Sequence, residues 1–240
     1  MSKMIDIDFD FQEEAGWRDS DRYSPTLQEY HRILWSKLLP SGKLFTLKKI
    51  SQNRLYHKSE LGEYILSSDR AVTVFRKQKQ LFKIISLIPE SEFLQFRKLS
   101  DTIGGIVIWP SNRIDGKMTI NGSRGFNRSI ADRFDLTIEC VRRYYLGEDN
   151  PLDDTFKRYS DFFMLFKDFK SYVEFFLLQD IVTDDFLAVK IATPFDNFRT
   201  SPIPGSFEQY LIYKDNTTKF LKARNSRIAK WACSHLVPNV

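Results

Sequence analysis

The 240-residue sequence predicts an α+β fold in which helices predominate and a small sheet contains a buried strand near residues 103–109. Two observations carry this prediction. The segment Ile103–Pro110, "IGGIVIWP", is a β-branched apolar run beside glycines and a proline, which is the pattern of a buried strand. An arginine- and glycine-rich connection follows, and Asn127–Leu146 then repeats apolar residues every three or four positions, as an amphipathic helix does.

The N-terminal half is predicted to open with an arm. In residues 1–23, acidic and apolar side chains alternate between Asp6 and Asp10, and this period of two indicates an acidic extended arm or an edge strand. Ser24-Pro25 has the form of a helix N-cap followed by a first-turn proline, so a helix is predicted from there to Pro40. The next predicted elements are strands at Lys43–Ile50 and Arg54–Lys58 and helices at Ala71–Phe75, Gln78–Ile88 and Ser91–Ser100.

The C-terminal half is predicted to be mainly helical. Aromatic residues at steps of three and four predict helices at Asp154–Phe166 and Phe169–Val182, and the same steps indicate a core more than a base-stacking surface. A short strand is expected at Ala188–Ala192. The last helix is expected from Ser206, which has capping-box spacing to Gln209, to Ala232. Because no linker or internal repeat interrupts the chain, residues 1–240 are predicted to form a single domain.

Composition restricts the class of protein. Hydrophobic residues make up 42% of the chain and 21 residues are phenylalanine, so a core can form without disulfides. The two cysteines, Cys140 and Cys233, have no metal-ligand or redox spacing, which favours a reducing, cytoplasmic compartment. No apolar run is long enough for a transmembrane helix, and the acidic N-terminus lacks the features of a signal peptide. The net charge of +5 permits an anionic partner without requiring nucleic acid.

The connection after the predicted strand is the candidate ligand site. Its glycines allow the backbone to approach a ligand, its cations suit phosphate or carboxylate, and it leads into a helix N-terminus, which favours anions. The proposed ligand-binding residues are Asn112, Arg113, Lys117, Asn121, Arg124 and Arg128. The spacing matches neither a P-loop nor a dinucleotide-binding motif. The alternative is a structural loop in which Asp115-Gly116 forms a hairpin turn.

Five residues are candidates for acid–base chemistry. Asp132, Asp135 and Glu139 lie on a charged stripe of the predicted helix and are candidates for a general base or a divalent-metal site. The same stripe also fits a solvated face or a buried lattice of carboxylates and arginines. His31 and His57 are candidates for general acid–base roles, and the alternative for each is a structural hydrogen bond. The histidines have no metal-ligand spacing, and the sequence identifies no cofactor.

Several segments resemble a bacterial family of uncharacterised proteins, and the similarity extends over nearly the full chain. Among them are "SPTLQEYHRILWSKLLPSG", "TIGGIVIWPSNRIDGKMTINGSRGFN", "DRFDLTIECVRRYYLGE" and "KARNSRIA". The resemblance implies a bacterial or bacteriophage-borne cytosolic protein that forms one unit, and it implies no activity, cofactor or catalytic residue.

The leading functional hypothesis is a phosphate- or nucleotide-directed enzyme or binding protein. Hydrolysis or group transfer is the expected chemistry if the protein is an enzyme, with nucleic-acid cleavage by a toxin- or defence-type protein among the options. On this hypothesis, Arg124→Ala abolishes ligand binding and leaves the fold intact. A third hypothesis is a carboxylate-bearing sugar or amino-acid derivative as ligand.

The alternative from another class is a non-catalytic protein that binds proteins or nucleic acids through its acidic arm and its basic last helix. On this alternative, the arginine- and glycine-rich connection after the predicted strand, which we call the arginine loop, is only scaffold. The basic stretch is Lys219, Lys222, Arg224, Arg227 and Lys230, which is either a solvated face or an electrostatic groove, with Arg224 able to turn inward instead. The sequence leaves the oligomeric state open.

Overall fold

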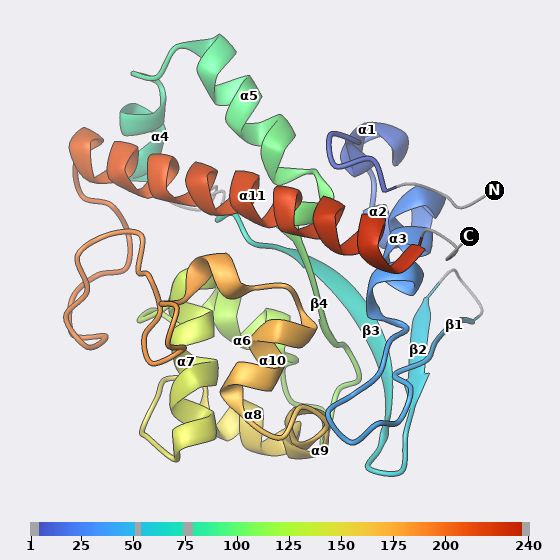
Figure 1. The fold of residues 1–240 in the computed structure, drawn as a ribbon. Coiled ribbons are helices and arrows are strands. Elements are labelled where there is room, and N and C mark those ends of the chain that lie inside the picture. Colours follow the sequence, from blue (N-terminus) through green and yellow to red (C-terminus); the bar gives the residue numbers. More distant parts are fainter. Residues whose placement is uncertain (1–4, 51–53, 74–78, 237–240) are drawn as a thin grey trace.

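A four-stranded antiparallel sheet lies beside a larger set of helices in the computed structural model, which describes residues 5–50, 54–73 and 79–236 (Figure 1). The strands are β1 (Leu47–Lys49), β2 (Leu55–Lys58), β3 (Glu63–Arg70) and β4 (Ile106–Pro110). Each strand pairs with the next along the chain, giving the order β1-β2-β3-β4. The predicted helix-predominant α+β class is therefore confirmed.

The strand β4 is buried at all five of its positions, as the apolar sequence predicts. It begins later than expected, because Ile103–Gly105 form a short 3₁₀ turn, η2, that contacts the last helix, α11 (Phe207–Leu236). Gly104 is needed at this contact, because its N–H donates to Asn225 Oδ1 at 2.7 Å and a Cβ there would lie 2.4 Å from the same oxygen.

The N-terminal region differs from the predicted arm or edge strand. Residues 5–23 form no strand and instead include α1 (Phe11–Glu14) and α2 (Ser20–Tyr23). The acidic side chain of Asp10 caps α1 by accepting hydrogen bonds from two backbone N–H groups at 2.9 Å, so it starts a helix instead of extending an alternating strand. The helix α3 (Pro25–Trp35) begins at the predicted Ser24 cap and ends before Pro40.

The strand β3 was missed because its alternation of buried and exposed residues lasts only to Leu66 and is followed by polar side chains. The neighbouring strands are shorter than predicted. The predicted helix at Ala71–Phe75 is not present over residues 71–73, and its remaining residues lie outside the described part of the chain. The helices α4 (Lys79–Ile85) and α5 (Glu90–Ser100) match their predictions closely.

The predicted helix at Asn127–Leu146 begins seven residues late. Ala131 and Asp132 have left-handed backbone angles, with φ of 46° and 65°, so α7 spans Phe134–Leu146. The preceding connection contains a helix of its own, α6 (Ile120–Phe126), capped by Thr119. The connection is therefore partly regular structure and not a long loop.

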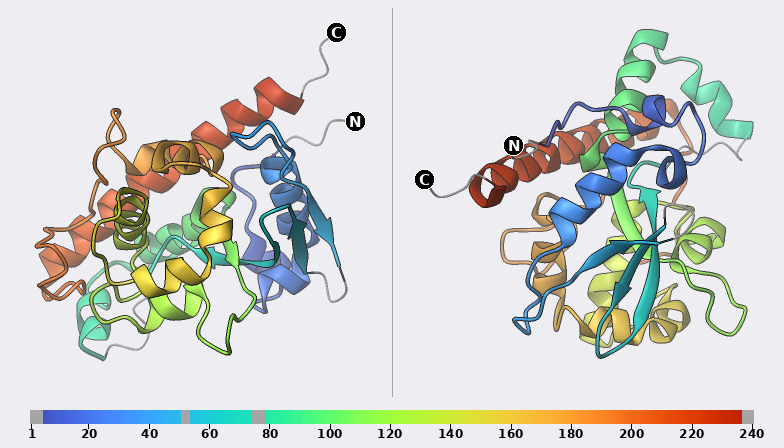
Figure 2. Two further views of the ribbon diagram at one scale, coloured as in Figure 1. Left: turned by 90° about the horizontal axis from the view of Figure 1, so that it is seen from below. Right: turned by 90° about the vertical axis from the view of Figure 1, so that its right-hand side faces the viewer.

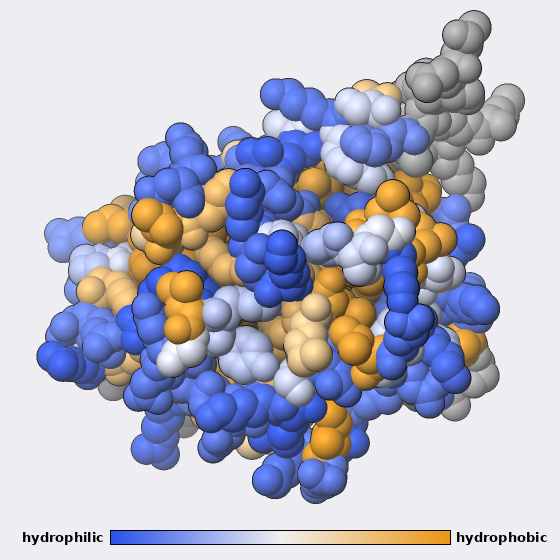
Figure 3. Space-filling model, turned by 60° about the horizontal axis from the view of Figure 1, so that its bottom comes forward, coloured by the Kyte–Doolittle hydropathy of each residue, from blue (hydrophilic) through white to orange (hydrophobic). Residues whose placement is uncertain are grey.

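The aromatic residues of the C-terminal half form core, as predicted. They lie on α8 (Asp153–Arg158), α9 (Ser160–Met164) and α10 (Phe169–Phe175), and they join one cluster of buried side chains that extends from Ile5 to Ala232. The expected strand at Ala188–Ala192 is only an isolated bridge between Val182 and Val189. The helix α11 crosses the whole molecule and packs on η2, α5 and α4 (Figure 2). On the face shown in Figure 3, apolar residues form separate patches among hydrophilic ones.

Candidate functional site

The two faces of β3 separate the predicted site residues into two groups. On one face Asp69 binds Arg124, and Ser67 Oγ accepts from Asn121 Nδ2 at 3.4 Å. Ser68 points the opposite way, and its hydroxyl lies 2.8 Å from His31 Nε2. Because successive strand side chains point to opposite faces, His31 and the arginine loop are on different sides of the sheet.

Arg124 is fully buried and is bound by protein groups. Its guanidinium pairs with the Asp69 carboxylate and donates to the backbone oxygens of Asp132, at 2.9 Å, and Arg70, at 3.4 Å. Its Nε donates to Thr137 Oγ1 at 3.2 Å. These bonds hold the left-handed backbone at Asp132 and thereby delay the start of α7. Each guanidinium nitrogen of Arg124 thus donates to a group of the protein.

The other predicted ligand-binding residues divide into structural and exposed ones. Asn112 links β3 to the residue between α8 and α9, because its side-chain oxygen accepts from Ile65 N and its backbone oxygen accepts from Tyr159 Oη at 2.6 Å. Arg113, Lys117 and Arg128 are exposed, and their side chains form no hydrogen bond or ion pair with the described residues. The predicted ligand-binding residues thus differ in exposure, from the fully buried Arg124 to these three exposed cations.

The three predicted carboxylates face different partners. Asp132 lies near Arg124, with 3.7 Å between its Oδ1 and the arginine Nε. Glu139 accepts hydrogen bonds at 2.8 and 2.9 Å from the guanidinium groups of Arg142 and Arg143. Burial opposes ionisation there, but these bonds hold the pKa of Glu139 below its ordinary value. Among the described residues, no three histidine, cysteine or acidic side chains converge as a metal site would require.

Asp135 is buried and is engaged on both carboxylate oxygens. Arg133 pairs with both of them, with a distance of 3.1 Å between its Nε and Oδ1, and the backbone N–H of Ala192 donates to Oδ2 at 2.8 Å. With Glu139, this arrangement matches the lattice of carboxylates and arginines more closely than it matches a free base.

Both predicted histidines are buried, and both form hydrogen bonds within the protein. Trp35 Nε1 donates to His31 Nδ1 at 3.0 Å, so neutral His31 carries its proton on Nε2 and donates it to Ser68. Burial, with a contribution from Arg224, lowers the pKa of His31 to about 3. His57 lies against the Phe45 ring with 3.7 Å between ring centres, and its Nδ1 bonds to Thr46 O at 3.1 Å. Burial lowers the pKa of His57 as well. Both rings thus contact groups within the fold, His31 through Trp35 and Ser68 and His57 through Phe45 and Thr46.

A cavity of about 420 Å³ lies between the start of α7 and the middle of α11, and we call it the α7–α11 cavity. Its wall includes Asp135, which the sequence predicted, and the apolar rings of Phe134 and Phe220, whose centroids are 5.9 Å apart. Lys190 and Lys219 also line it, and their side chains form no ion pair or hydrogen bond with the described residues. The site therefore combines a stacked aromatic wall with two unpaired ammonium groups.

Comparison with known proteins identifies the family. The model of the Family of unknown function (DUF6994) matches residues 5–228, nearly the whole chain. The chain belongs to the DUF6994 family. No curated protein and no solved structure matches it. None of the helices in the described residues of this DUF6994 protein is both long enough and apolar enough to cross a bilayer.

The sequence indicated some residues of the α7–α11 cavity in this DUF6994 protein, but not that they lie together. Asp135 was predicted, and Lys219 was recognised within the basic stretch of the last helix. Lys190 was missed, because a single lysine in "LAVKIA" has no local pattern that indicates a site. Lys190 lies on the cavity wall together with Ile181, to whose backbone oxygen its own N–H donates at 2.8 Å.

Proposed function

We propose that this DUF6994 protein binds a phosphate-bearing small molecule, of nucleotide type, in the α7–α11 cavity. The observation that carries the proposal is the pair of unpaired ammonium groups, Lys190 and Lys219, on the wall of one cavity. Lysine binds phosphate as a point charge with three donors, and two such charges match a phosphate that carries close to two negative charges.

The other charges at the cavity largely cancel. Asp135 is paired with Arg133, and Asp180 is held by Arg227 through two bonds of 2.7 and 2.9 Å. The two lysines are therefore a net excess of positive charge at this wall. An anion bound between them supplies the counter-charge that the described protein groups do not.

The rest of the wall suits a ligand with an apolar face. Phe134 and Phe220 offer aromatic surface, and the hydroxyl of Thr217 and the amide of Asn216 also line the cavity. A volume of about 420 Å³ lies within the range of ligand pockets, which is roughly 300–1,000 Å³. A phosphate that is joined to a sugar carrying a base contacts both the lysines and the aromatic rings, whereas inorganic phosphate contacts only the lysines.

The proposal is limited to binding. Asp135 is the only predicted acid–base residue on the described wall, and its oxygens accept hydrogen bonds from Arg133 and Ala192. No proton transfer is therefore assigned to it.

Calorimetric titration with nucleoside monophosphates, and with the matching nucleosides, tests the proposal. Lys190→Gln and Lys219→Gln should each weaken nucleotide binding by roughly 1.5–3 kcal/mol, or about ten- to a hundredfold in Kd. The control is Lys222→Gln, one helical turn further on α11, because Lys222 is exposed and is not part of the wall. If the nucleoside binds as tightly as the nucleotide, or all three variants behave alike, the proposal fails.

A polyanion-binding surface is the second candidate, favoured by the exposure of Arg113, Lys117 and Arg128. In the same titration series, a single-stranded oligonucleotide separates the two candidates. Binding that falls steeply between about 50 and 200 mM salt indicates phosphate-backbone contacts. Loss of that binding in Lys117→Gln, with nucleotide binding intact, assigns it to the exposed loop and not to the cavity.

A further inference from the structure

We propose that a second cavity, between α4, α5 and α11, binds a small carboxylic acid with an apolar body. This α4–α5 cavity encloses about 360 Å³. Its apolar wall consists of Val72, Phe82, Ile85, Phe93, Phe96 and Tyr210. Two arginines, Arg70 and Arg97, line the same space. A pocket that is mainly apolar with a few polar groups is the usual form of a small-molecule site.

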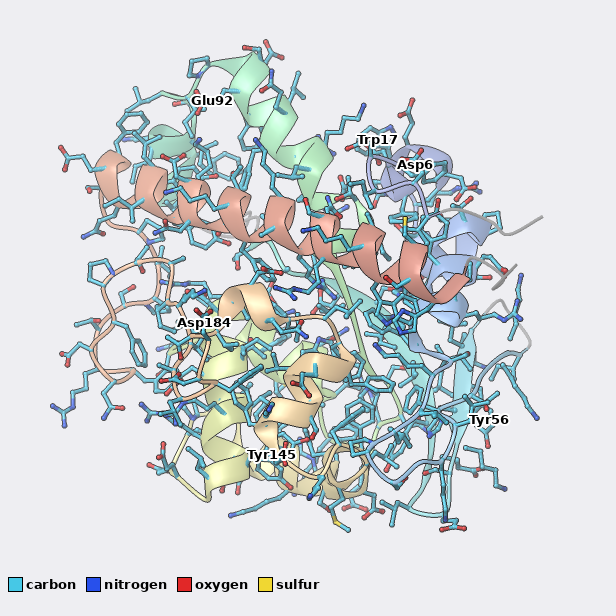
Figure 4. All side chains as sticks on the ribbon, viewed as in Figure 1. Asp6, Trp17, Tyr56, Glu92, Tyr145 and Asp184 are labelled. Carbon is cyan, nitrogen blue, oxygen red and sulfur yellow. The ribbon has the colours of Figure 1, made fainter. Side chains whose placement is uncertain are left out.

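Arg97 is the group that indicates an anion. It is half-buried, and its side chain forms no hydrogen bond or ion pair with the described residues. Its Nε is shielded from solvent and has no acceptor there. The guanidinium lies over the Trp17 ring, 4.4 Å from the ring centroid, and Figure 4 shows Trp17 in the segment that joins α1 and α2. A shielded donor without an acceptor is costly, and a ligand carboxylate removes that cost.

Arg70 does not add a second free charge. Its Nη2 lies 2.7 Å from Asp101 Oδ1 and donates to Gln12 Oε1, also at 2.7 Å. Among the described residues that line the cavity, Arg97 therefore carries the one uncompensated positive charge. One charge beside a largely aromatic wall suits a monoanionic carboxylate, whereas the two lysines of the α7–α11 cavity suit phosphate.

The walls are held together by an ion pair across two elements. Glu92, at the start of α5 (Figure 4), pairs with Lys214 of α11 at 2.6 Å. Tyr210, one turn earlier on α11, packs against Tyr213 of the α7–α11 cavity with 6.2 Å between ring centroids. The two cavities are thus neighbours with different linings, and this inference does not depend on the proposed nucleotide site.

Octanoate and 1-octanol are the probes, because they share an apolar chain and differ in the charged head. Titration of the full chain should show octanoate binding about tenfold tighter than octanol, as expected for one added charge-assisted contact. Arg97→Gln should remove that preference and keep octanol binding. The matched control, Lys98→Gln, changes the next residue of α5, which is exposed and does not line the cavity, and should keep the preference.

A second variant tests the location. Ser86 is exposed at the cavity wall, so Ser86→Phe should weaken both probes by occupying the space while leaving the fold unchanged by circular dichroism. Equal binding of octanoate and octanol to the unchanged protein overturns the proposal. So does an acid preference that survives Arg97→Gln, or binding of both probes that survives Ser86→Phe. Nucleotide binding measured on the same samples distinguishes this failure from failure of the α7–α11 site.

Discussion

The segment of residues 112–139 and the wall of the α7–α11 cavity both carry cations, but the surroundings of those cations differ. In the segment, Arg124 and Arg133 are buried and bound to carboxylates, hydroxyls and carbonyls of the protein. At the cavity, Lys190 and Lys219 have no such partner among the described residues. Within the segment, the two buried arginines are thus paired inside the fold, whereas Arg113, Lys117 and Arg128 are exposed and, like the two cavity lysines, have no such partner among the described residues.

The difference shows what a buried arginine does in this protein. Arg224 on α11 is the extreme case: it is fully buried, and its guanidinium donates at 2.9–3.2 Å to four backbone oxygens, those of Gly104, Ile106, Phe176 and Leu177. Burial lowers the pKa of Arg224 to about 10. These oxygens lie in η2, at the first residue of β4 and just after α10, so Arg224 donates hydrogen bonds to backbone acceptors where these elements meet. Cations that serve as such connectors are not available to a ligand.

At neutral pH, the largest expected effect comes from removing such a connector in the segment itself. Arg124→Ala should lower the free energy of unfolding by about 3 kcal/mol, because it leaves Asp69, one-quarter exposed, without its buried partner. Arg113→Ala, the exposed control, should change it by less than about 0.5 kcal/mol. Urea unfolding measures both values. Nucleotide binding to folded Arg124→Ala should be unchanged, and an abolished affinity with full stability would restore the arginine loop as the ligand site.

Patterns that depend on local periodicity were predicted well. The buried strand at Ile106–Pro110, the helix from Ser24 and the aromatic core all follow from spacing along one element. Patterns that depend on a distant partner were not. The strand β3 contains polar residues because they bind α3 and α6, and the late start of α7 follows from a left-handed turn held by Arg124.

The candidate site was predictable only in part for the same reason. Arginine, glycine and asparagine in a connection indicate an anion pocket by composition, but composition does not distinguish a ligand's oxygen from the protein's own. Lys190 joins Lys219 only through the fold of residues 181–192. The apolar cavity at Arg97 had no local signal, because its wall combines the end of β3, the helices α4 and α5 and the distant Tyr210 of α11.

His31, a buried polar group on the opposite face of β3, should make the free energy of unfolding depend on pH. The unfolded chain takes up the proton near pH 6.5, whereas the folded state keeps His31 neutral down to about pH 3. Between these values the unfolded state binds more protons, so the contribution of His31 falls by about 1.4 kcal/mol per pH unit as the pH is lowered. It is fully present above pH 6.5.

Urea unfolding at several pH values measures this slope. Between pH 6.5 and about 3, the free energy of unfolding of His31→Gln should fall less steeply than that of the unchanged protein. The two slopes should differ by about 1.4 kcal/mol per pH unit. His235→Gln, at an exposed position on α11, is the control and should keep the full slope. Equal slopes in all three proteins would mean that His31 is protonated in the folded state and open to solvent, contrary to its placement.

The smallest expected effect lies in the capping of α6. Thr119 Oγ1 accepts from Gly122 N at 3.2 Å, and Thr119→Ala should cost about 1 kcal/mol because it removes this N-cap. Thr119→Ser keeps the oxygen and should restore most of the loss. If the connection is scaffold, the alanine variant changes stability and leaves the Kd for nucleotide unchanged. If the connection is a ligand site, the frayed helix moves Asn121 and Arg124, so the Kd rises together with the loss of stability and recovers in the serine variant.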